Sequence, residues 1–386
     1  MGIETTTELL EREDELAELA DALSHARQSR GRVVLVEATA GLGKTSLLRA
    51  SSGAAAEAGF TCLRARASEL ERDFAYGCVR QLLEPVVARA AQPERARLFE
   101  GAAALAMPLF APTGGVAAAP SGDAFAMLHG LYWLLNNLTD EGPVVLAVDD
   151  LHWSDRESLR FLAYLAPRLD GLPVAVLASA RPEESGTGDL ARLVAAPEIT
   201  VLRPRPLSDE GTAALCVRRL GTEVAPDFAA ACREATLGNP FFLEALLREA
   251  KEEGLAAGPP AVDRVRQLGP AAVARAVLLR LAGQPAARAL VRAVAVLGDG
   301  AGLADVAPLA GLSVADAAAA ADLVAGLAIL RPGDGLAFAH PVVREAVYAD
   351  IGRRERARMH ARAAGILAGR GASDERVAAQ TAAAEP

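Results

Sequence analysis

The stretch that decides the fold is VEATAGLGKTSLLRA, residues 36–50. It follows a run of branched apolar residues, RVVLVE (32–37), and leads into a segment with helical spacing. A strand that enters a glycine-rich turn and then a helix directs backbone N–H groups and the positive helix end at one point. The spacing is that of G-x-x-x-x-G-K-[ST], with Ala38 in place of the first glycine. The pattern therefore predicts a phosphate-binding loop.

Each residue type in this loop has a chemical reason. Gly41 and Gly43 let the backbone approach a phosphate without a Cβ clash. We expect the Lys44 ammonium, a catalytic candidate, to bridge the β- and γ-phosphates, and the Thr45 hydroxyl to bind Mg²⁺. Lys44 is one of only two lysines, the other being Lys251. The residues predicted to bind nucleotide are Thr39, Ala40, Gly41, Leu42, Gly43, Lys44, Thr45 and Ser46.

In VVLAVDDLHW (144–153), a second apolar run is followed by two carboxylates, Asp149 and Asp150. Asp149 is expected to reach the metal through water, as a Walker B aspartate does. Asp150 stands where a water-activating acid would be, although it is one methylene shorter than glutamate. Arg181 ends the run LPVAVLASAR (172–181). It is either a contact to the γ-phosphate or one of many surface arginines.

Strand and helix patterns alternate through the first half of the chain. Strands are expected over 32–37, 60–67, 143–150, 172–180 and 198–204. Helices are expected over 12–28, from the loop to a left-handed cap at Gly59, over 74–107 and after Trp153, where Ser154 and Glu157 form a capping box; residues 108–122 are expected to be a flexible loop. This alternation predicts an α/β fold, a doubly wound parallel sheet.

After about residue 207 the strand signal disappears. Ser208 opens a run of helices to Gly254, and GLAAGPPAVD (254–263) has the composition of a linker. The rest is helical apart from LAILRPGDGLAFAH (327–340), whose Pro-Gly-Asp-Gly turn predicts a small hairpin and with it a winged-helix module. The predicted domains are an N-terminal helix (1–28), a nucleotide-binding α/β domain (29–206), a helical lid and linker (207–262) and a winged-helix-like domain (263–386).

Composition excludes several classes of protein. The chain has 386 residues, 52% of them hydrophobic, and a net charge of −9, which argues against a broad nucleic-acid surface. Its four cysteines form no C-x-x-C pair, so we expect buried reduced thiols. The acidic N-terminus has no signal-peptide pattern and no run of 18 uncharged apolar residues occurs, so we expect a cytoplasmic protein without a membrane partner.

Several stretches together resemble one family. They are LLERE (9–13), ATAGLGKTSLL, ELERDFAYGCVRQLLEP (69–85), HGLYWLLNNL (129–138), VDDLHWSDRESLRFLAYLAPRL, ATLGNPFFLEAL and FAHPVVREAVY (338–348). They resemble the ATPase region of the large ATP-binding LuxR-type transcriptional regulators, which belong to the STAND class of signal-transduction P-loop ATPases. The resemblance covers nearly the whole chain. It implies an AAA-like domain, a helical lid and a winged-helix domain.

The resemblance also implies roles for three further residues. Arg12 matches an arginine near the adenine, although Glu11 replaces the family's glycine; the alternative is a surface charge pair. Pro240 matches a lid proline that packs on the base, or it simply starts a helix. His340 matches a histidine near the β-phosphate, or it is a helix-end or core residue. His152 and Trp153 are expected to be packing residues behind the metal site.

The function expected from these patterns is a slow ATPase switch with ATP or ADP and Mg²⁺ as ligands. In the family, ADP holds a closed form and ATP permits an open, self-associating one, whereas DNA is bound by a C-terminal helix-turn-helix beyond the residues matched here. The chain is therefore expected to be a fragment, a truncated member or a stand-alone version, with no DNA contact assignable within it. The alternatives are a nucleotide-binding module that never hydrolyses and, less favoured because of the long helical tail, a small-molecule kinase.

Overall fold

The computed structural model describes residues 9–68, 71–111, 124–182, 188–281, 283–327, 329–331, 335–339 and 341–384. The chain divides into two compact units. The first contains the chain up to Thr39 and Gly43–Arg205, and the second contains Ala40–Leu42 and Pro206 onward.

The first unit is built on a parallel sheet that has five strands in the described part of the chain, in the order β2-β3-β4-β1-β5. All pairings are parallel, and each strand matches one of the expected apolar runs. The strands are β1 (Arg32–Glu37), β2 (Thr61–Arg66), β3 (Val144–Asp149), β4 (Val174–Ala180) and β5 (Ile199–Leu202). The predicted doubly wound α/β fold is confirmed.

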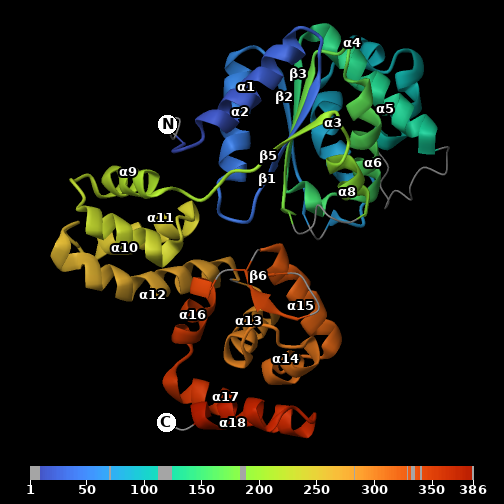
Figure 1. Cartoon of the computed structure of the whole chain (residues 1–386). Helices are drawn as coiled ribbons and strands as arrows, with labels where there is room; N and C mark the ends of the chain where they lie inside the picture. Colours follow the sequence, from blue (N-terminus) through green and yellow to red (C-terminus); the bar gives the residue numbers. More distant parts are fainter. Residues whose placement is uncertain are drawn as a thin grey trace. The chain divides into compact units, whose positions relative to one another are not determined.

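Helices cover both faces of this sheet, as Figure 1 shows. Helices α1 and α2 lie on one face, and α3, α5, α6 and α8 lie on the other. The helices of this unit are α1 (Glu13–Arg27), α2 (Lys44–Glu57), α3 (Gly77–Arg89), α4 (Gln92–Leu98), η2 (Gly101–Phe110), α5 (Ala124–Leu138), η3 (Thr139–Glu141), η4 (Leu151–Trp153), α6 (Arg156–Leu165), η5 (Ala166–Arg168) and α8 (Gly188–Val194).

Alternate residues of the buried strands supply two separate cores. On β1, Val34 and Val36 pack with α1 and α2, whereas Val33 and Leu35 pack with the helices of the opposite face. Successive side chains of a strand point to opposite faces, so a strand covered on both sides is apolar throughout. This is why RVVLVE and VVLAVD read as continuous apolar runs.

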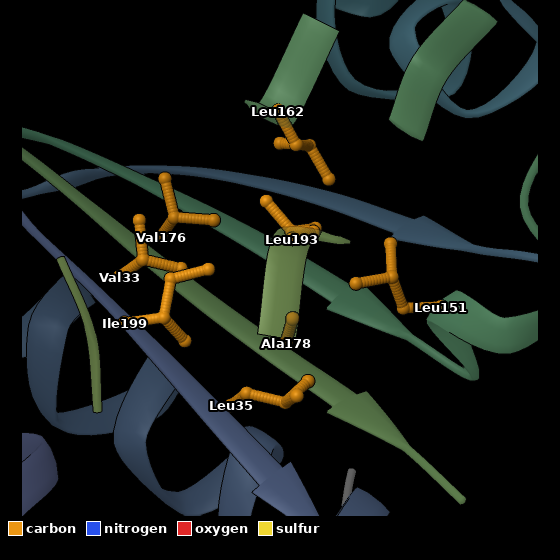
Figure 2. A pocket seen from close by; sticks show the side chains of 8 residues that line it. All are labelled: Val33, Leu35, Leu151, Leu162, Val176, Ala178, Leu193 and Ile199. Carbon is orange, nitrogen blue, oxygen red and sulfur yellow. The ribbon is translucent and has the colours of Figure 1, made fainter. Parts of the chain in front are cut away.

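A small apolar cavity lies between the sheet and helices α6 and α8. Figure 2 shows Leu162 and Leu193 facing Val33, Val176 and Ile199 on the strands. Its volume is about 10 Å³, which is close to the space that one water molecule needs. Because its lining is apolar and its volume so small, this cavity is a packing defect of the core and not a ligand site.

Two local expectations for this unit are corrected. The start of α6 is capped by Asp155, whose carboxylate accepts from Ser158 N at 2.8 Å, and not by a Ser154–Glu157 box. Asp155 is the better cap because it is buried and also accepts from Tyr76 N at 2.8 Å and Cys78 N at 3.2 Å, which ties α6 to the start of α3. The predicted loop over 108–122 begins later, since 108–110 belong to η2, and residues 112–122 lie outside the described ones.

Among its described residues, the second unit is helical apart from one short hairpin. Strands β6 (Leu330–Arg331) and β7 (Ala337–Phe338) pair antiparallel, as the sequence predicts, and lie between α15 and α16 along the chain. Its helices are α9 (Asp209–Leu220), α10 (Pro226–Thr236), α11 (Pro240–Glu252), η6 (Pro259–Ala261), α12 (Val262–Arg280), α13 (Pro285–Leu297), α14 (Leu303–Ala310), α15 (Val314–Gly326), α16 (Pro341–Asp350), α17 (Arg353–Gly369) and α18 (Asp374–Ala384).

The predicted linker at 254–263 is shorter than expected. The 3-10 turn Pro259–Ala261 fills its end, and α12 begins at Val262 and packs against α10 and α11. The unit boundary at 205–206 lies next to the expected end of the α/β domain, whereas the division at 262–263 into lid and winged helix stays a prediction.

The cysteines match the expected burial in part. Cys78, Cys216 and Cys232 are buried free thiols, whereas Cys62 is half-buried. Among the described residues, no single helix has both the length and the apolar composition to cross a membrane; one bent pair, Leu303–Ala310 with Val314–Ala325, meets the criterion only when the two are joined.

Candidate functional site

The loop after β1 has the backbone that its two glycines permit. Gly41 has φ +87° and Gly43 has φ +90°, the left-handed region that favours glycine. Gly43 is the N-cap of α2, which begins at Lys44. Gly43 makes no side-chain cap hydrogen bond, and the start of a helix carries the positive end of its dipole. The strand, loop and helix therefore have the form of an anion-binding helix start.

The Lys44 ammonium is buried beside this loop. Its side chain is 7% exposed, and Nζ donates to Ala38 O at 2.6 Å and Thr39 O at 3.1 Å. These carbonyls lie at the exit of β1, so the strand end positions the ammonium. Ala38, which replaces the first glycine of the motif, is itself buried and fits its methyl group into the core.

The two residues predicted to bind the metal are in direct contact. Thr45 Oγ1 donates to Asp149 Oδ2 at 2.8 Å, although 104 positions separate them in the sequence. Thr45 lies in the first turn of α2, and Asp149 is the last residue of β3. A hydroxyl and a carboxylate are the hard oxygen donors that Mg²⁺ prefers. The donor set therefore fits a magnesium ion.

Ser179 is a member of the site that sequence reasoning missed. It is fully buried on β4, and its hydroxyl donates to Asp149 Oδ1 at 2.6 Å while accepting from Asp150 N at 2.9 Å. The two oxygens of Asp149 are thus held from two sides, by Thr45 and by Ser179. The available signal was a single hydroxyl in the otherwise apolar run VAVLASA.

Asp150 differs from Asp149 in its surroundings. It adopts φ +55°, and its Oδ2 lies 3.3 Å from Arg66 NH2 at the end of β2. The Asp150 side chain is 17% exposed and that of Arg66 is 71% exposed, so the pair is largely solvated and weak. Asp150 lies at the same sheet edge as Asp149, and Arg66 is a neighbour that the sequence did not indicate.

Arg181 and His152 complete the buried polar groups of this edge. Arg181, directly after β4, is 7% exposed, so the surface-arginine alternative is wrong. His152 is 4% exposed, and burial, followed by the positive charges of Arg181, Lys44 and Arg72, lowers its pKa to about 2. The imidazole is therefore neutral at physiological pH.

Arg12 is also buried, which rules out its surface alternative. It is 5% exposed at the start of α1, and its guanidinium donates to Glu11 O at 2.6 Å and Arg205 O at 2.7 Å. Burial lowers the pKa of Arg12. Glu11, which stands in place of the expected glycine, has φ +53°, so it keeps the backbone conformation that glycine would favour.

The remaining predicted residues are placed as follows. Ser46 is exposed in the first turn of α2. Pro240 is the first residue of α11, whose N-cap Asn239 accepts from Phe241 N, so it does start a helix; its contact with a base stays a prediction. His340 lies outside the described residues. Among the residues that are described, no group of three or more His, Cys, Asp or Glu side chains forms a metal-binding cluster.

Comparison with known families agrees with this geometry. Residues 8–177 match the family model described as an AAA ATPase domain. The match spans α1, the loop, β3 and most of β4. This part of the chain is an AAA-type P-loop ATPase domain, and the helical second unit follows it. No curated protein sequence matches the chain.

A solved structure shows the same fold at low sequence identity. A Walker-type ATPase of Pyrococcus abyssi is similar with a TM-score of 0.50 and 15% identity, over 88% of this chain and 96% of that one. The Orc1 protein of Aeropyrum pernix, solved in complex with DNA, has a TM-score of 0.48 and 14% identity, over 89% of this chain and 93% of that one. At such identities the likeness concerns the fold alone.

Proposed function

We propose that this chain is the nucleotide-binding module of a LuxR-type signal-transduction regulator, which binds MgATP and hydrolyses it slowly. The observation that carries the proposal is the hydrogen bond between Thr45 and Asp149, beside a buried lysine at the start of α2. A helix start, an ammonium and a paired hydroxyl and carboxylate are together the requirements for a metal-bound polyphosphate.

The roles proposed for the individual residues follow from their chemistry. The backbone of residues 39–46 would hold phosphate oxygens, and Lys44 would neutralise them. Thr45 and Asp149 would hold Mg²⁺, which supplies charge neutralisation at the phosphates when it is bound. Arg181, buried on the neighbouring strand end, would contact the terminal phosphate. As the family resemblance implies, we propose that Arg12 and Pro240 contact the adenine base of the nucleotide. We propose that His340 senses its β-phosphate.

Slow hydrolysis is supported by the short side chain of Asp150, the candidate acid next to Thr45 and Asp149. Asp150 is shorter than glutamate, and its carboxylate faces the guanidinium of Arg66. A shorter side chain holds an attacking water farther from the carboxylate that would activate it. A nucleotide that is retained for long periods can act as a signal, because it shifts a conformational equilibrium by its differential affinity for the two states. We propose that the ADP and ATP states differ in self-association.

The test is the release of phosphate by the purified chain, with Asp149→Asn as the control. The expected result is a turnover well below one per second in the wild type and none in the variant, while both bind nucleotide. Rapid multiple turnover without a partner would contradict the slow switch. Binding without any release in the wild type would favour the non-hydrolysing module instead.

Self-association needs its own measurement. The molar mass of the chain, measured by light scattering, is expected to rise with MgATPγS and to stay monomeric with MgADP. Equal masses in both nucleotides would contradict the switch, although they would leave nucleotide binding intact.

A further inference from the structure

His152 is a buried histidine that packing alone does not explain. It lies in η4, three residues after Asp149, and its side chain is 4% exposed. Its ring is tilted by 47° against Trp153, with the ring centroids 5.3 Å apart. An apolar side chain could fill this space equally well. The sequence predicts a packing residue, whereas the polar ring in a buried position indicates a different role.

Neither ring nitrogen of His152 has a hydrogen-bond partner among the residues that the structure describes. A neutral imidazole has one donor and one acceptor, and burying them without partners is unfavourable. Buried polar groups in native proteins nearly always find a partner, either in the protein, in water or in a ligand. Since the described residues supply no partner, we expect a ligand to supply one.

The surroundings of the ring indicate the chemistry of that partner. The charges that act on it are those of Arg181, Lys44 and Arg72, all of them cations. These cations favour an anionic ligand. Because burial, and after it these cations, keep the imidazole neutral, the ring retains one N–H donor that can approach an anionic oxygen.

We propose that His152 binds the terminal phosphate of a nucleoside triphosphate through its ring N–H, and so distinguishes the triphosphate from the diphosphate. This inference rests on the proposed function. It assigns to the site a third buried group besides Lys44 and Arg181, and it concerns discrimination between nucleotides and not the chemical step. A role in packing predicts no such discrimination.

The experiment compares His152→Phe with the matched variant His360→Phe. His360 is equally buried, at 4% exposure, but its ring nitrogens are bonded to Tyr348 Oη at 2.8 Å and Gln380 Oε1 at 2.6 Å. We expect His152→Phe to keep or raise the urea midpoint of the ligand-free chain, to lose about tenfold in affinity for ATPγS and to keep its affinity for ADP within about twofold. His360→Phe should lower the midpoint and leave the ATPγS-to-ADP affinity ratio unchanged.

The outcomes separate the two proposals. If the wild type binds neither nucleotide, the proposed function fails. If it binds both and His152→Phe keeps the wild-type affinity ratio, the inference about His152 is overturned. Should His152→Phe fail to fold, ring ¹⁵N resonances of the wild type supply the answer. One histidine, identified by its absence in His152→Gln, should shift with ATPγS and not with ADP, and a resonance that shifts equally with both would overturn the inference.

Discussion

The hydroxyl of Thr45 lies 2.8 Å from a carboxylate oxygen of Asp149, and this contact joins the first turn of α2 to the end of β3. The two residues belong to separate motifs. Their contact depends on the sheet order, in which β4 pairs with β1 and β3 pairs with β4, so that the carboxyl ends of these parallel strands lie at one edge. In open α/β sheets, ligands bind at this edge.

The contact predicts how magnesium affects binding. Thr45→Val and Asp149→Ala each remove one oxygen donor, so ATP affinity should become nearly the same in Mg²⁺ and in EDTA. In the wild type, Mg²⁺ should raise the affinity by about tenfold or more, since a hard cation needs such donors. Titration calorimetry in both buffers checks this, and Ser24→Ala on the exposed side of α1 is the control. A Mg²⁺ effect of wild-type size in both variants would contradict the metal assignment.

Ser179 should matter for stability as well as for the site. Ser179→Ala removes one of the two acceptors of the half-buried Asp150 N, which also donates to Asp149 Oδ1 at 3.2 Å, and it removes the donor that lies 2.6 Å from Asp149 Oδ1. We expect a loss of about 1–2 kcal/mol in the free energy of unfolding, because two hydrogen bonds disappear and each contributes about 0.5–1.5 kcal/mol net. Urea denaturation followed by circular dichroism measures it. A loss below about 0.5 kcal/mol would mean that these hydrogen bonds contribute little.

Asp155 should be the more important structural carboxylate. Asp155→Ala removes the acceptor of Tyr76 N, Cys78 N and Ser158 N, all buried. We expect the free energy of unfolding to fall by about 3 kcal/mol, because the helix cap and two further hydrogen bonds disappear together. Asp155→Asn should lose less, since its amide oxygen can still accept.

The matched control for this prediction is Asp263→Ala. The Asp263 side chain is 90% exposed and lies 3.7 Å from Arg266, so its removal should change stability by less than about 0.5 kcal/mol. Equal losses of unfolding free energy in the Asp155 and Asp263 variants would contradict the claim that Asp155 stabilises the fold by accepting three hydrogen bonds.

Much of the fold could be predicted because its signals are local. The runs of RVVLVE and VVLAVD are apolar at every position since each strand is covered on both faces, and Gly41 and Gly43 mark a turn that requires positive φ. Lys44, Thr45 and Asp149 could be named because each follows directly from a strand or a turn in its own motif.

The unpredicted parts depend on strand order and competing caps. Ser179 reaches Asp149 because β4 lies beside β3, and a serine in an apolar run does not reveal its neighbour. Ser154 and Asp155 are both good caps, and only the position of α3 decides between them. The burial of Arg12, Arg181 and His152 likewise depends on which elements pack around them.

The central claim is that the loop at 39–46 grips a polyphosphate through Lys44, and MgATP affinity tests it most directly. The matched control is Lys251, the only other lysine of the sequence. It lies at the exposed end of α11, and its Nζ donates to Arg219 O. The account predicts that Lys44→Ala loses at least a hundredfold in MgATP affinity while Lys251→Ala binds as the wild type does, an expectation that follows from losing a buried charged contact. A Lys44→Ala variant that folds and binds MgATP with unchanged affinity would contradict it.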